Sequence, residues 1–133
     1  KKIVSVHDSG KIINPQMAAG EVYGGVLQAF GFSVMEHLGA DEQGLLYGGT
    51  MLEYKIPTML DAPEIVADFI ETRDPHGPYG AKSLGEPPIV SVLAAISNGV
   101  FNATGMTLND APFTPQKVLN AIKQKRIKEG ADS

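Results

Sequence analysis

The stretch that decides the fold of this chain reads Gly80-Ala81-Lys82-Ser83-Leu84-Gly85-Glu86-Pro87-Pro88. Strand-like sequence precedes it, and the apolar run 89–100 that follows is typical of a buried helix. The stretch therefore predicts a glycine-rich loop that leads into a helix N-terminus, with the carboxylate of Glu86 at the junction. Pro87 suits the first helical position and disfavours the α conformation at the residue before it. We therefore expect Glu86 in an extended conformation, facing whatever the loop faces.

The residues alone leave two roles open for Glu86. Acidic side chains favour helix N-termini, so the carboxylate could simply cap the helix that follows. The alternative is a chemical role, because Gly85 lets the backbone approach a ligand closely and the loop would present the carboxylate to that ligand.

A second informative segment lies upstream and reads Asp8-Ser9-Gly10-Lys11-Ile12-Ile13-Asn14-Pro15. It predicts a turn followed by a helix, with Asn14 as the N-cap and Pro15 in the first turn. Apolar residues then recur every four positions, which predicts one buried stripe. We expect the helix to stop at Gly39. The stripe consists of Ala18, Val22, Val26, Phe30 and Val34, with Leu27 and Leu38 beside it.

This predicted helix contains four interior glycines, each costing about 1 kcal/mol relative to alanine. Something should therefore come close enough to need the missing side chains. A neighbouring helix or strand is one candidate. The other is a cofactor along the N-terminal half of the helix, where free N–H groups suit a phosphate. The four are Gly20, Gly24, Gly25 and Gly31.

Together, the two segments resemble the molybdenum hydroxylases, the xanthine dehydrogenase and aldehyde oxidase family, over residues 4–125. The resemblance implies that the chain helps to hold a molybdopterin cofactor containing molybdenum. It also implies that Glu86 is the general base in a hydroxylation that uses oxygen from water. Glu21 departs from the family pattern, which commonly has glutamine there in contact with the pterin. The implied cofactor-binding residues are Gly20, Glu21, Gly24, Gly25, Lys82, Ser83, Leu84 and Gly85. Lys82 could bind a phosphate, pair with a carboxylate or lie on the surface.

The resemblance implies a C-terminal part of the large subunit, inactive alone, with iron–sulfur and FAD groups on other domains or subunits. The expected partners are the remaining molybdenum-binding domains or subunits, in an oligomer. The expected substrate is a purine, another N-heterocycle or an aldehyde. An alternative is a non-catalytic assembly module that only completes a partner's cofactor site. A nucleotide-binding loop is disfavoured, because Lys82-Ser83 precedes the last glycine instead of following it.

Composition sets the remaining bounds. The 133 residues carry a net charge of −4 and no cysteine, which argues against a nucleic-acid surface, disulfides and thiolate metal sites. No apolar run approaches a membrane span, and we expect a cytoplasmic protein. No residues are predicted to ligate a metal directly, and the lone His76 is expected on the surface. We expect one domain over residues 1–128 and a frayed tail over residues 129–133.

The order of the predicted elements is strand, helix, strand, strand, helix, helix, which indicates an α+β fold of two layers with helices on one face of a mixed sheet. Strands are expected over residues 1–6, 45–54 and 64–72, the last with both faces partly covered. A second helix is expected over residues 87–104 and a final one from Thr114-Pro115. The segment 106–111 is expected to be extended or a short strand.

Overall fold

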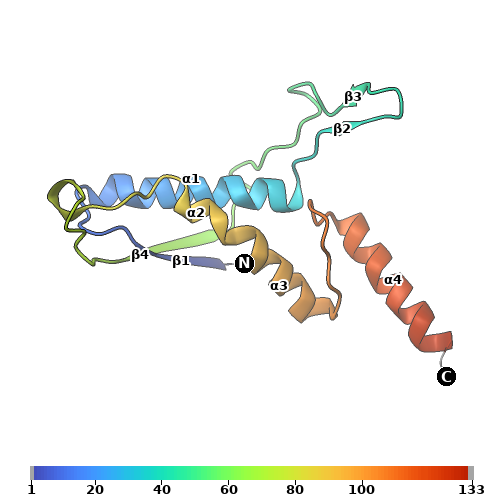
Figure 1. Ribbon diagram of the computed structural model, residues 1–133. Coiled ribbons are helices and arrows are strands. Elements are labelled where there is room, and N and C mark those ends of the chain that lie inside the picture. The colour runs from blue at the N-terminus through green and yellow to red at the C-terminus, as the bar shows by residue number, and fades with distance from the viewer. Residues whose placement is uncertain (1, 132–133) are drawn as a thin grey trace. The chain divides into compact units, whose positions relative to one another are not determined.

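The computed structural model describes residues 2–131 and has an α+β fold, as expected (Figure 1). No helix in that part of the chain is both long and apolar enough to cross a membrane. In chain order the elements are β1 (Lys2–Asp8), α1 (Pro15–Val34), β2 (Gly39–Ala40), β3 (Leu46–Tyr47), β4 (Glu64–Ile70), the 3₁₀ turn η1 (Pro78–Gly80), α2 (Pro87–Val90), α3 (Val92–Thr104) and α4 (Pro115–Ala131).

The chain divides into two compact units, which are described separately. The first comprises the residues up to Ala29 together with 57–92, and the second comprises 30–56 and the residues from 93 onward. The first unit contains β1, most of α1, β4 and α2, and with them every predicted site residue.

The first unit is built on a parallel pair of strands. β1 and β4 are in register from Lys2 opposite Glu64 to Asp8 opposite Ile70. Both predicted strands are thus confirmed, and β1 extends two residues beyond its predicted end. Burial alternates along β1: Ser5 is buried, whereas Val4 and Val6 are exposed. One face of this pair is therefore open. The expectation that both faces of β4 are at least partly covered holds for the face of Ile65, Ala67 and Phe69, whereas Asp68 and Ile70 on the other face are exposed.

Helix α1 begins as predicted. The Asn14 side chain accepts a hydrogen bond from the Met17 amide at 3.1 Å, and Pro15 is the first helical residue. Its buried side includes Val22, Val26 and Ala29, all with no exposed surface.

The expected stop of α1 at Gly39 is wrong. The helix ends at Val34, where the amides of Met35 and Glu36 both bond to the Gly31 carbonyl, over four and five residues respectively. Gly39 instead pairs in β2, and Leu38 is exposed rather than part of the buried stripe.

The predicted helix over 87–104 is interrupted at Ser91, which separates α2 from α3. Within α3, Val92 is buried as expected, but Ala95 and Gly99 of the predicted packed face are exposed. The predicted stop is confirmed, because Gly105 has φ +69°, which favours glycine.

The second unit has little sheet. Only Leu46–Tyr47 of the predicted strand 45–54 forms a ladder, antiparallel to β2, and Gly48 with φ +74° turns the chain away after it. The segment 106–111 is irregular and unpaired. Helix α4 starts as predicted, with the Thr114 hydroxyl accepting from the Lys117 amide at 3.3 Å. It continues through Ala131, so the predicted frayed tail begins inside a helix, and residues 132 and 133 lie outside the described part.

Candidate functional site

The loop at residues 80–88 is anchored at its start to the turn that follows β1. The Lys82 amide donates to the Ser9 carbonyl at 2.8 Å, and the Lys11 amide donates to the Gly80 carbonyl at 2.9 Å. Gly10 has φ +62°, and a Cβ there would lie 2.3 Å from the Gly80 carbonyl oxygen. Only glycine fits this approach. The two informative segments of the sequence are therefore joined in one structure.

An ion pair lies at the same place. The Lys82 ammonium is 2.7 Å from Asp8 Oδ2 and 2.6 Å from the Thr72 hydroxyl. Hydrogen bonds from Lys82, Thr72 and the Gly10 amide hold the pKa of Asp8 well below its usual range. Asp8 is therefore ionised at neutral pH. Of the roles left open for Lys82, the structure shows pairing with a nearby carboxylate.

The far end of the loop is anchored by packing. Pro88 is fully buried, and a Cβ on Gly25 would lie 2.9 Å from the Pro88 Cβ and 3.4 Å from Ile89 Cγ1. Gly25 thus has the simpler of the two explanations considered for the helix glycines, namely close packing against a neighbouring element.

Glu86 lies between these two anchors. Its backbone is αR, with φ −88° and ψ −31°, so the expected extended conformation is wrong. The Glu86 carbonyl accepts from the Ile89 amide at 2.9 Å, and this turn outweighs the preference imposed by Pro87. The carboxylate is exposed and makes no capping hydrogen bond, so the capping role lacks its defining contact.

Two further glycines of α1 have no packing explanation within this chain. A Cβ on Gly20 or Gly24 would meet no atom within 4 Å, and both residues are exposed. They are four positions apart and so lie on one side of the helix. Glu21 is also exposed, and its Oε2 lies 4.0 Å from the position that a Cβ of Gly85 would take. The residues that follow these two glycines, Glu21 and Gly25, are therefore the ones that face the loop, and Gly20 and Gly24 open to solvent beside them.

The structure thus brings several predicted site residues together in the first unit. Glu21 and Gly25 of α1 lie beside Gly85 and Pro88 of the loop, and Glu86 stands between the anchors. Ser83 is exposed and Leu84 half-buried. The sequence reasoning missed Thr72, whose only signal is its position as the last residue of a predicted strand.

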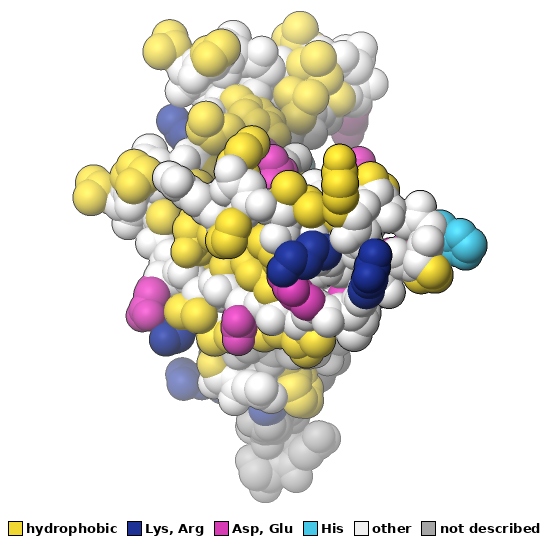
Figure 2. All heavy atoms as spheres, turned by 90° about the vertical axis from the view of Figure 1, so that its left-hand side faces the viewer, with side chains coloured by type: hydrophobic (Ala, Val, Ile, Leu, Met, Phe, Trp, Pro, Cys, Tyr) yellow, Lys and Arg dark blue, Asp and Glu magenta, His cyan; other side chains and the backbone are white. Residues whose placement is uncertain are grey.

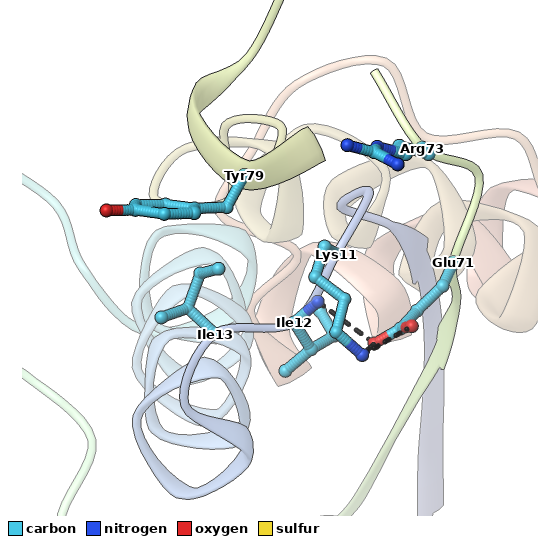
Figure 3. Close-up of a pocket in the computed structure, with 6 residues that line it drawn as sticks. All are labelled: Lys11, Ile12, Ile13, Glu71, Arg73 and Tyr79. Atoms are coloured by element: carbon cyan, nitrogen blue, oxygen red, sulfur yellow. Dashed lines mark hydrogen bonds and ion pairs between the residues drawn. The ribbon is translucent and has the colours of Figure 1, made fainter. Parts of the chain in front are cut away.

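A separate cavity of about 620 Å³ lies in the same unit, and none of the predicted site residues lines it (Figure 3). The Lys11 ammonium and the Glu71 carboxylate in its wall bind each other at 3.1 Å. The Ile12 amide and Lys11 together keep the pKa of Glu71 below its usual value. Tyr79 lies over Ile13 on the other side. These contacts give the cavity a neutralised charge pair and apolar walls, and it lacks the free carboxylate that defines the predicted site.

Within residues 2–131, no three His, Asp or Glu side chains are grouped to hold a metal ion.

The chain is similar to known proteins over most of its length. A family model described as the molybdopterin cofactor-binding domain matches residues 1–63. The xanthine dehydrogenase molybdenum-binding subunit of Escherichia coli O157:H7 is 44% identical over 88% of this chain and 16% of its own length. The nicotine 6-hydroxylase large subunit of Paenarthrobacter nicotinovorans is 38% identical over 92% of this chain and 15% of its own. The chain belongs to the molybdenum hydroxylase family.

Solved structures of molybdenum hydroxylases are also similar to the structure of this chain. Quinoline 2-oxidoreductase from Pseudomonas putida 86 matches with a TM-score of 0.84 and 33% identity over 90% of this chain and 16% of its own. Aldehyde oxidoreductase from Desulfovibrio desulfuricans matches with a TM-score of 0.82 and 37% identity, covering 91% of this chain and 13% of its own. The chain thus corresponds to part of a molybdenum hydroxylase large subunit and spans 13% to 16% of the length of these relatives. The matched family model includes α1 but not the Gly80–Pro88 loop.

Proposed function

We propose that this segment forms one wall of the molybdopterin site in a molybdenum hydroxylase and supplies Glu86 as the general base. The observation that carries the proposal is the state of Glu86. Its carboxylate is exposed and forms no capping hydrogen bond, and the loop that carries it is fixed at both ends. A carboxylate that only stabilised a helix would bond to the helix amides, and this one does not.

The residues present fit the cofactor. Gly20 and Gly24 leave a strip of α1 without side chains, where a flat ring system can approach the helix backbone closely. Glu21 follows Gly20 directly and lies near Gly85, and the exposed residues Glu21, Ser83 and Gly85 offer hydrogen-bonding groups. When bound, molybdopterin supplies the metal centre that receives electrons from the substrate. Because the chain has no cysteine, iron–sulfur clusters of the usual kind must lie elsewhere, and we expect FAD there as well.

The chain's own part in the reaction is a proton transfer. An ionised Glu86 accepts a proton at a carboxylate oxygen from the water-derived nucleophile. Loss of this proton makes the oxygen of the nucleophile a better attacking group. The anchors at Lys82 and Pro88 hold the carboxylate in place between turnovers. The proposed substrates are a purine, another N-heterocycle or an aldehyde, and the relatives with printed substrates include nicotine, aldehydes and quinoline. A module without catalytic function that completes a partner's site remains the alternative.

Gly24 tests whether the cofactor lies along α1. In the complete enzyme, Gly24→Ala should lower the molybdopterin content at least several-fold, because the added methyl group occupies the strip where the rings lie. The same change should not destabilise the apo-protein, since alanine favours a helix by about 1 kcal/mol over glycine and meets no atom within 4 Å here. Cofactor content, measured by extraction, and apo-protein melting temperature are the readouts. Full cofactor content in the variant would contradict the proposed placement.

We also propose that the rest of the same large subunit covers apolar surface that this segment leaves open. Parallel sheets are normally covered on both faces, yet Val4 is 61% exposed and Ile70 is 58% exposed on one face of the β1–β4 pair. In the loop after β3, Met51 is 97% exposed and Leu52 89%. Figure 2 shows hydrophobic side chains open over one side of the molecule. Exposure on this scale marks an interface.

The double substitution Val4→Lys/Val6→Lys tests this covering. If the β1 face is buried in the complete subunit, two ammonium groups would be taken out of water there, and Asp68, opposite Val6, could pair with only one of them. Little soluble, assembled enzyme should then form. On a solvated face the same change would shift stability by only about 0.5 kcal/mol. Gln43→Lys, in an exposed polar turn, is the matched control. Normal yield and melting temperature of the double variant would contradict the covering.

A further inference from the structure

A three-residue cluster lies where the two parallel strands end and the Gly80–Pro88 loop begins. Asp8 is the last residue of β1, Thr72 follows the end of β4, and Lys82 is at the start of the loop. The carboxyl ends of adjacent parallel strands lie at one edge of the sheet. Residues far apart in the sequence therefore meet at this edge.

Each of the three side chains in the cluster contacts the other two. The Lys82 ammonium binds both Asp8 Oδ2 and the Thr72 hydroxyl, and the Thr72 hydroxyl also donates to Asp8 Oδ2. The Thr72 amide donates to Asp8 Oδ1 at 3.2 Å. The Lys82 and Asp8 side chains are about one third exposed, at 32% and 36%. Partial shielding of this kind strengthens an ion pair relative to one in open water.

We propose that Asp8, Thr72 and Lys82 position the loop so that the Glu86 carboxylate stays where it can accept a proton, an inference that rests on the proposed function. The Lys82 side chain ties the start of the loop by charge to a strand end, and the Lys82 amide is bound to Ser9 as well. Pro88 fixes the other end by packing. Glu86 lies on the short span between these two attachments.

The same geometry disfavours a phosphate at Lys82. Two of the three donors of its ammonium group are already used within the cluster. The neighbouring Asp8 carboxylate cancels the positive charge and would repel an anion. Lys82 therefore positions the loop, and it affects the reaction only by fixing where Glu86 lies.

Two substitutions in the complete enzyme test the cluster. Lys82→Met removes the charge and keeps much of the apolar part of the side chain. Thr72→Val replaces the hydroxyl with a methyl group. Displacing a catalytic group by about 1 Å can cost about 100-fold in rate, so we expect kcat to fall about 10- to 100-fold for Lys82→Met and in the same direction for Thr72→Val. KM and molybdopterin content should change little. Thr72→Ser keeps the hydroxyl, so its kcat should stay near that of the parent enzyme, in contrast to Thr72→Val.

The decisive arm repeats both changes on a Glu86→Gln background. If the cluster acts only through Glu86, Lys82→Met should lower the residual rate of that background no more than about two-fold, since residues that act as a unit are not additive. Equal losses in both backgrounds, or unchanged kcat in both single variants, would overturn the inference. Loss of molybdopterin from Lys82→Met but not from Thr72→Val would overturn it in favour of cofactor binding.

Hydrogen exchange gives a readout that does not depend on activity. The amides of residues 11 and 82, which bond to the Gly80 and Ser9 carbonyls at the start of the loop, should exchange faster in Lys82→Met and Thr72→Val than in Thr72→Ser, whereas those of β1 and β4 should not change. Unchanged exchange in the loop would overturn the inference even if rates fall. Failure of the proposed function has a different signature, because Glu86→Gln alone would then retain its turnover.

Discussion

In the complete enzyme, Glu86→Gln should reduce turnover by about 10²- to 10⁴-fold, the usual effect of removing a general base. Glutamine is nearly the same size as glutamate but cannot take up the proton. The fold should tolerate the change, because the side chain is exposed and makes no capping hydrogen bond. Melting temperature and cofactor content should therefore stay near the parent values. Turnover and melting temperature must be measured on the same preparation.

Glu42→Gln is the matched control, since Glu42 is another exposed carboxylate, placed in the polar turn between β2 and β3. It should leave turnover unchanged. If Glu86 served only as a helix cap, its substitution would spare the rate and cost up to about 2 kcal/mol of stability. Near-normal turnover with a lowered melting temperature in Glu86→Gln would rule out the catalytic role, and with it the main part of the proposed function.

Gly25→Val should lower both the stability and the turnover of the enzyme. The first added carbon would lie 2.9 Å from the Pro88 Cβ, and a valine adds two methyl groups beyond it. Overpacking of this kind typically costs about 1–3 kcal/mol. Pro88 is fully buried and follows closely after Glu86, so relief of the clash by movement of Pro88 would also displace the carboxylate.

The contrast with Gly24 makes this prediction specific. Gly24 precedes Gly25 directly, yet a Cβ on Gly24 meets no atom within 4 Å. Gly24→Val should change the free energy of unfolding of the apo-protein by no more than about 0.7 kcal/mol through helix propensity, so its melting temperature should stay near that of the parent. Gly25→Val should lower it by several degrees. Equal melting temperatures for the two variants would show that Gly25 is not packed against Pro88.

The pattern of residues along the chain was enough to locate the local elements that bear on the site. Asn14-Pro15 and Thr114-Pro115 start helices as expected, and Gly105 ends one, because capping and glycine conformation depend on neighbouring residues. The two motifs also led to the family that the comparisons show. The end of α1 was misplaced, since it depends on bonds from Met35 and Glu36 to Gly31 rather than on a terminating glycine.

Within the candidate site, the sequence by itself determined that one loop carries a carboxylate beside glycine and proline, and that it leads into a helix. Only the tertiary structure decided what each glycine is for: Gly25 packs on Pro88, whereas Gly20 and Gly24 face open space. It also decided that Lys82 meets Asp8 and Thr72. No local rule predicts such contacts, because they join residues far apart in the chain. Their energies arise only when the parallel pairing of β1 with β4 brings the ends of both strands to one edge.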